Sequence, residues 1–330
     1  MNNTQKDEYT VIKAITTILV VIGHATRMYS RGGGAIEMPM NNLLDCITIF
    51  IYAFHMPLFV FVSGAVYSSC ISIGKYKDMK KFIVTKAKRL LVPYFAFGLL
   101  YVTPTMLLLR ITELNIKGYI FEGIICNIDS RHLWYLYVLF IMLILTRIMQ
   151  PVVDKYPIVM WVLFVVCTIV AFRYWIAPNI FGIRHLARYY CYFIGGYLFD
   201  KKKEWLGKIL SKYWWCSIFE LLFILYVVLF TVDEKWRVLA AYLGIFMCYA
   251  LVTKTKDFIC KIKVYEIIQK NSMGIYLFHP MIIYLAFFIE NNRNISPYIF
   301  SMVVIIIASV LSYVATIIIK RAKLNFLLGE

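Results

Sequence analysis

Two ionisable residues in the first apolar run have a spacing that allows joint chemistry. Lys13 and His24 both lie within residues 11–29, eleven positions apart. An α-helix turns about 100° and rises about 1.5 Å per residue, so both side chains share one face, about 16 Å apart along the axis. A cation at the mouth and an imidazole deeper inside suit a channel for an elongated anion. Alternatively, Lys13 extends to the interface and His24 hydrogen-bonds a neighbouring helix.

The second apolar run contains polar residues that lipid ordinarily excludes. His55 precedes Pro57, and a proline inside a helix frees a backbone carbonyl and favours a kink. Ser63-Gly64 is small enough for another backbone to approach closely. His55 is therefore either a catalytic candidate or a hydrogen-bonded core histidine beside the kink. Asp45 either orients the ring of His24 or lies at the interface as a carboxylate.

Basic residues crowd between the second and third apolar runs. Lys86 and Arg89 stand one helical turn apart next to the membrane, so both can reach a single phosphate. The bias of cytoplasmic loops toward positive charge, with attraction to anionic lipid headgroups, also accounts for part of this run. The basic residues are Lys75, Lys77, Lys80, Lys81, Lys86, Lys88 and Arg89.

Further candidates for substrate binding lie near the outer ends of the apolar runs. Trp134 and Tyr135 can stack on a sugar, although aromatic residues also anchor helices at membrane interfaces. Arg184 begins a basic outer cluster, which suits an anionic or sugar-phosphate partner. His279 is a third histidine inside an apolar run, next to a proline.

The elements that must position these residues are membrane-spanning helices. The chain of 330 residues is 62% hydrophobic and 16% charged, too apolar for a soluble fold of this length. The apolar runs are continuous, so they predict helices, in which every backbone group is satisfied internally. We predict an all-α membrane bundle forming one domain over residues 1–330, with no appended soluble domain. About ten spans are expected, at 11–29, 43–70, 90–109, 132–149, 157–177, 186–199, 213–232, 236–253, 272–290 and 297–319.

The distribution of charge predicts the orientation. The formal net charge is +17, but the lysines and arginines gather in short alternate loops rather than on one folded surface. This pattern excludes a nucleic-acid partner and places both termini in the cytoplasm. The eight cysteines are scattered, mostly within apolar runs, without the spacing of a metal site or a disulfide framework. We therefore expect no metal.

The ordered set of motifs resembles the acyltransferase-3 family of integral membrane O-acyltransferases, in particular its fucose 4-O-acetylase-like and capsular polysaccharide O-acetyltransferase branch. Many members have arginine where Lys13 and Lys86 stand, and lysine cannot form arginine's bidentate fork with a phosphate. The absence of an esterase-like domain indicates a stand-alone type. The matching residues are Lys13 with His24, Phe54–Phe59, Ser63-Gly64, Lys86 with Arg89, Leu133–Leu136, Gly195-Gly196, and Ser272–Tyr276 with His279.

The resemblance implies transfer of an acyl group, acetyl by default, from cytoplasmic acyl-CoA to a hydroxyl of a surface polysaccharide or its lipid-linked precursor. His24 is expected to be the general base. Lys13, Lys86 and Arg89 would hold the phosphates of coenzyme A, while His55 and His279 orient the acceptor or relay a proton. The expected location is the bacterial plasma membrane, in contact with lipid. A transporter or flippase for a polysaccharide or lipid-linked glycan precursor is the alternative.

Overall fold

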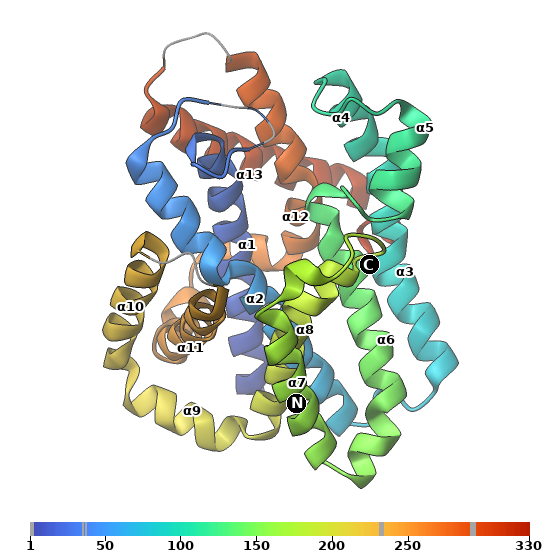
Figure 1. Cartoon of the computed structure of the whole chain (residues 1–330), viewed down its shortest axis with the longest axis vertical. Coiled ribbons are helices and arrows are strands. Elements are labelled where there is room, and N and C mark those ends of the chain that lie inside the picture. Colours follow the sequence, from blue (N-terminus) through green and yellow to red (C-terminus); the bar gives the residue numbers. More distant parts are fainter. Residues whose placement is uncertain (1–2, 35, 37, 231–233, 291–294) are drawn as a thin grey trace.

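The protein is an all-α bundle in a computed structural model that describes residues 3–34, 36, 38–230, 234–290 and 295–330 (Figure 1). No strand occurs in these residues, as the continuous apolar runs predict. The α-helices are α1 (Asn3–Thr26), α2 (Asn42–Ser72), α3 (Met79–Phe97), α4 (Thr103–Leu108), α5 (Ile116–Gly118), α6 (Trp134–Lys155), α7 (Ile158–Ala171), α8 (Ile183–Lys201), α9 (Lys203–Lys212), α10 (Ser217–Phe230), α11 (Glu234–Ile259), α12 (Lys263–Glu290) and α13 (Pro297–Arg321).

Short 3-10 and π turns join or extend several of these helices. Two of them, η1 and η4, contribute residues to the lining of the cavity described below. The turns are η1 (Arg27–Tyr29), η2 (Gly98–Val102), η3 (Tyr119–Ile125), η4 (Arg131–Leu133), η5 (Tyr174–Ile176), η6 (Trp214–Cys216) and η7 (Asn325–Leu328).

Seven helical segments within the described residues are long and apolar enough to cross a membrane. They coincide with seven of the ten predicted spans. The other three correspond to α7 and α10, of 14 residues each, and to α8, which has charged residues at both ends. Residues 231 and 232 of the predicted span 213–232 lie outside the described residues. The seven segments are Glu8–Tyr29, Asn42–Ser72, Met79–Leu108, Arg131–Lys155, Trp236–Ile259, Lys263–Glu290 and Pro297–Arg321.

Helix α1 lies at the centre of the bundle, in contact with α2, α11, α12 and α13 (Figure 1). Its threonines do not need partners from other helices. The hydroxyls of Thr16 and Thr17 donate to the carbonyls of Ile12 and Lys13, at 2.6 and 2.9 Å. Because these bonds satisfy the hydroxyls within the helix, α1 can be surrounded by apolar neighbours and still carry polar side chains on one face.

Helices α2 and α8 are in direct backbone contact, which the small residues of both helices permit. A Cβ atom added at Gly64 would lie 1.9 Å from the Phe193 carbonyl oxygen. A Cβ atom at Gly196 would lie 1.9 Å from the Phe61 carbonyl oxygen. The expectation that Ser63-Gly64 admits another backbone is therefore confirmed for Gly64. Helix α2 continues as a helix through Pro57.

We predict that replacing Gly196 by alanine prevents this packing, because a backbone carbonyl cannot move aside as a flexible side chain can. Overpacking of this kind costs about 1–3 kcal/mol or more, and we expect loss of the monodisperse peak in fluorescence-detected size-exclusion chromatography.

Gly207→Ala is the matched control, since the nearest atom to its added Cβ, the Tyr249 hydroxyl, is 3.8 Å away. A Gly196→Ala protein as stable to heating as the Gly207→Ala protein would contradict the proposed contact.

Candidate active site

A cavity of about 820 Å³ lies between the helices that surround α1. Its lining combines ionisable, aromatic and apolar side chains from α1, α2, α6, α7, α8, α11 and α12. A polar, partly aromatic cavity inside a membrane bundle is typical of a site that binds a ligand. The polar lining includes His24, Arg27, Tyr52, His55, Asp129, Arg131, His132, His185, Arg188 and Arg237.

All five histidines of the chain gather at this place, although they come from distant parts of the sequence. Four of them line the cavity, and the fifth, His279, packs against two of those four. The ring centroid of His279 is 5.2 Å from that of His24 and 5.9 Å from that of His132. The prediction that His24, His55 and His279 are intramembrane histidines thus extends to a shared site.

The His24 side chain is half-buried in the cavity wall. Its ring packs edge-on against His279 and lies 6.2 Å from the ring centroid of Tyr52. No side-chain hydrogen bond joins His24 to another described residue. In the neutral ring, one nitrogen therefore keeps a lone pair that can accept a proton from a ligand in the cavity.

Backbone carbonyls set the tautomers of the three buried histidines. His55 Nδ1 lies 2.8 Å from the Ile51 oxygen, and His279 Nδ1 lies 2.8 Å from the Ile275 oxygen. A carbonyl only accepts, so in each ring Nδ1 donates and Nε2 is the unprotonated nitrogen of the neutral form. His279 Nε2 is buried without a hydrogen-bond partner among the described residues.

His132, like His185, lines the cavity but was not among the site residues predicted from the sequence. Its Nε2 lies 3.1 Å from the Leu277 oxygen, and its own carbonyl accepts a hydrogen bond from the Tyr276 hydroxyl. These contacts tie η4 to α12 beside His279. The adjoining Trp134 and Tyr135 suggested an interfacial anchor, whereas the rarity of histidine in this chain is the signal that would have identified His132.

The predicted sugar-stacking residues occupy different positions. Trp134 lines the cavity and stacks on His185 at 4.2 Å and on Tyr189 at 4.8 Å between ring centroids. Tyr135 instead shares a hydrogen bond of 2.9 Å with the Ser63 hydroxyl. Arg184 does not line the cavity, and its Nε donates to the Ala177 oxygen at 3.0 Å. The aromatic wall of the cavity therefore includes Trp134 but not Tyr135.

The three predicted phosphate-binding residues converge around Arg89. Arg89 lies within electrostatic range of Lys13, of Lys86 and of Tyr135. The Lys86 ammonium donates to the Tyr76 hydroxyl at 2.8 Å and lies 4.6 Å from that ring's centroid. Tyr135 lies in turn 5.9 Å from the Tyr276 ring, so polar side chains extend from this basic group toward the histidines.

The segment after α13 packs on α3 at Arg89. Gly329 has φ +72°, and a Cβ atom there would lie 2.2 Å from the Arg89 carbonyl oxygen. Only glycine tolerates both the left-handed backbone and this close approach. The Glu330 carboxylate pairs with the Lys320 ammonium at 2.9 Å, which holds the segment on the bundle. The C-terminal segment therefore packs against the backbone of α3 at the position of Arg89.

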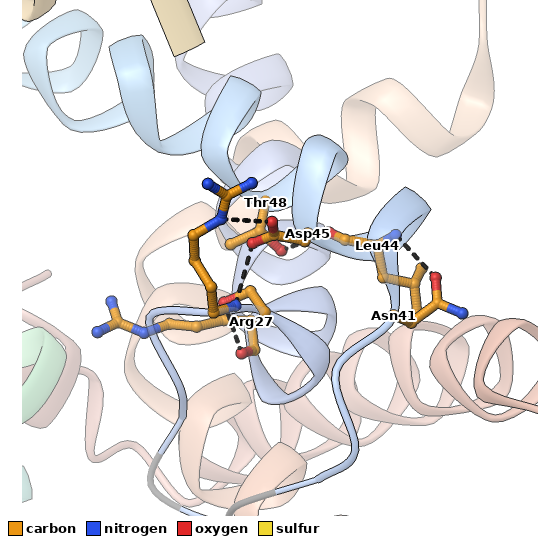
Figure 2. Close-up of polar contacts among 7 residues, drawn as sticks. Arg27, Asn41, Leu44, Asp45 and Thr48 are labelled. Atoms are coloured by element: carbon orange, nitrogen blue, oxygen red, sulfur yellow. Dashed lines mark hydrogen bonds and ion pairs between the residues drawn. The ribbon is translucent and has the colours of Figure 1, made fainter. Parts of the chain in front are cut away.

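Asp45 makes no hydrogen bond to His24 and instead binds Arg31 in the turn that follows α1. Its carboxylate is 1% exposed and accepts from the Arg31 backbone N–H at 3.1 Å and from Arg31 Nε at 2.7 Å (Figure 2). Next to it, the Thr48 hydroxyl donates to that of Thr26 at 2.8 Å, linking α2 to the end of α1. Asn41 caps α2 by accepting from the Leu44 N–H.

This ion pair predicts an unequal effect of removing its two partners. Arg31→Ala leaves the buried Asp45 carboxylate with only a backbone donor, and an under-satisfied buried charge costs about 1–3 kcal/mol or more. Asp45→Asn keeps an oxygen acceptor and leaves behind an arginine that is 58% exposed, so its effect is smaller. Thermal unfolding of both variants in detergent measures the difference, and a larger loss for Asp45→Asn would contradict this role.

A scan against protein families matches the acyltransferase domain of the acyltransferase-3 family over residues 7–316. Neither a search of curated proteins nor a search of solved structures finds a match to the chain. Among the described residues, no three His, Cys, Asp or Glu side chains are placed to hold one metal ion. The family match covers most of the sequence, including every helix that lines the cavity. The chain belongs to the acyltransferase-3 family and is a multi-pass integral membrane acyltransferase.

Proposed function

We propose that the protein transfers a short acyl group, acetyl by default, from acyl-CoA to a hydroxyl of a cell-surface polysaccharide or its lipid-linked precursor. The observation that carries this proposal is the half-buried His24 ring, which lines the cavity without a hydrogen bond to any described residue. The whole chain, 1–330, would act as one domain in a bacterial plasma membrane, with both termini cytoplasmic. This location agrees with the branch of O-acetylases that the sequence resembles.

His24 is the general base in this proposal. A sugar hydroxyl is a poor nucleophile at neutral pH, and removing its proton during attack typically contributes 10²–10⁴-fold in rate. In direct transfer, the hydroxyl oxygen bonds to the thioester carbonyl carbon while His24 takes the proton. The carbon–sulfur bond then breaks, and the proton passes to the thiolate of coenzyme A. The ester and free coenzyme A are the products.

In this proposal His55 and His279 assist the step. His55 lines the cavity, and its Nε2 would accept a hydrogen bond from a second hydroxyl of the acceptor. His279 packs against the His24 ring, and its unpartnered Nε2 can receive a proton relayed from His24. Trp134 would stack on the apolar face of a sugar ring. Asp45 acts indirectly here, by holding the turn after α1.

Lys13, Lys86 and Arg89 would bind the phosphates of the acyl donor. Lys13 and Lys86 each interact electrostatically with Arg89, although the Glu330 carboxylate also interacts with Lys13. Lys13 and His24 are separated by about 16 Å along α1. The extended pantetheine arm of coenzyme A suits such a separation, with its phosphates at Lys13 and its thioester near His24.

Replacement of His24 by alanine tests the base directly. We expect the variant to insert and fold but to lose about 10²–10⁴-fold in transfer rate. The measurement is proton NMR of surface polysaccharide from the native strain, a deletion strain, and the deletion strain complemented with each variant. Ester acetyl signals should return with the native gene and not with His24→Ala.

Ile18→Ala is the matched control for this experiment, because Ile18 is an exposed residue of the same helix. A His24→Ala protein that is inserted at native levels and restores full acylation would overturn the base assignment. Unchanged esters on deletion, with less polymer at the surface, would favour the transporter or flippase alternative.

Arg89→Gln tests the donor site. Loss of one charged contact to a phosphate costs about 1.5–3 kcal/mol, so we expect KM for acetyl-CoA to rise about tenfold or more, with a smaller change in kcat. Lys88→Gln, at the exposed neighbouring position, should leave KM near the native value. An equal rise in both variants would show that only the general positive charge of the segment matters.

A further inference from the structure

Arginines are prominent among the described residues that line the cavity, although acyl transfer to a neutral sugar does not require them. Among its described lining residues, five are arginines and one, Asp129, is a carboxylate. Arginine remains charged at all physiological pH values. The arginines are Arg27, Arg31, Arg131, Arg188 and Arg237.

Two of these charges are balanced by carboxylates. Arg31 pairs with Asp45 at 2.7 Å, and Arg131 pairs with Asp129 at 3.1 Å. Arg27 is different. Its Nε donates to the Gly33 carbonyl oxygen at 2.9 Å, and its guanidinium carbon lies 5.1 Å from the centroid of the Tyr52 ring. Among the described residues no carboxylate forms an ion pair with Arg27, whose guanidinium lies in the cavity lining beside the Tyr52 hydroxyl.

A second donor stands next to Arg27. The Tyr52 hydroxyl is buried close to the Arg27 guanidinium, which can only donate, so its O–H group has no acceptor among the described residues. An unsatisfied buried hydroxyl costs free energy that a ligand oxygen would recover. The ring of Tyr52 lies 6.2 Å from that of His24. An anionic oxygen held by Arg27 and Tyr52 would therefore sit within one sugar unit of the proposed base.

We propose that the acceptor carries a negative charge, a carboxylate or phosphate on the sugar, bound by Arg27 and Tyr52 while a hydroxyl of the same or the adjoining sugar faces His24. This inference rests on the proposed function and specifies its acceptor class. Charge-assisted hydrogen bonds from a guanidinium to such an oxyanion are among the strongest in proteins.

The order of residues along α1 separates this anion site from the donor site. Lys13 precedes His24 by eleven residues, and Arg27 follows it by three, just past the end of the helix. A donor whose phosphates lie at Lys13 reaches His24 from one side. Arg27 lies on the opposite side, where the acceptor must approach if its hydroxyl is to attack the thioester.

Binding of short sugars to the purified, nanodisc-embedded protein, without acyl donor, tests the proposal. The probes are trigalacturonate against neutral maltotriose, and glucose 1-phosphate against glucose. We expect each anion to bind at least tenfold more tightly than its neutral counterpart, with the difference shrinking as salt is raised. Binding of either anion supports the proposal, and the pair identifies which acidic group is preferred.

Variants of single arginines test which residue is responsible for the preference for anionic sugars. Arg27→Gln should abolish the preference, whereas Arg27→Lys retains part of it, and Arg173→Gln, an exposed arginine outside the cavity lining, leaves it intact. Equal binding of anionic and neutral sugars by the native protein would overturn the proposal even if Arg27→Gln does not fold. The proposal would also be overturned if the Arg27→Gln protein bound coenzyme A more weakly but bound the anionic sugars as tightly as the native protein does.

These measurements are independent of acyl transfer. If the anions bind through Arg27 but deletion of the gene leaves polysaccharide esters unchanged, the acyltransferase proposal fails for this acceptor while the anion site stands. If esters disappear on deletion but the purified protein does not distinguish charge, the acyltransferase proposal stands and the anionic acceptor is rejected.

Discussion

The structure depends on the fact that hydrocarbon supplies no hydrogen-bond partners. Every polar group inside the bundle must therefore be satisfied by its own helix, by another helix, or by a ligand. Helix α1 shows the first solution in Thr16 and Thr17, whose hydroxyls bond to carbonyls one turn earlier. The contact between His132 and the Leu277 oxygen shows the second. What remains unsatisfied, above all His279 Nε2 and the Tyr52 hydroxyl, marks where chemistry or a ligand is expected.

The sequence predicted those features of the fold that depend on local periodicity and composition. The all-α class and the face shared by Lys13 and His24 follow from helix geometry alone. Hydropathy did not separate the full spans from α7 and α10, because an apolar run can also form a helix of only 14 residues. At Gly64 the small size of the residue was enough to predict a close helix contact, and the backbone of α8 does leave no room for a side chain there.

The parts of the site that the sequence did not predict depend on contacts between distant segments. The sequence suggested Asp45 as a partner of His24, because both residues lie near the outer ends of their predicted spans. In the structure, the turn after α1 brings Arg31 next to Asp45, and these two residues form an ion pair. His132 joins His279 across 147 positions through a carbonyl of α12, which no local pattern encodes. Arg27 was not among the predicted site residues, and only the folded structure shows that it lines the cavity without a described carboxylate as its partner.

A single helix therefore relates the two halves of the proposed reaction. Lys13, His24 and Arg27 follow one another along α1 and η1 at the centre of the bundle. In the proposed reaction, the helix would therefore fix how far the donor phosphates and the acceptor charge lie from the reacting carbonyl. Such an arrangement needs no movement of coenzyme A through the membrane, because only its pantetheine arm has to reach His24. In this proposal the stacked rings of Trp134, His185 and Tyr189 would provide an aromatic surface for the acceptor sugar. This geometry favours rate acceleration by a high effective concentration of the two substrates at His24, rather than by a large conformational change.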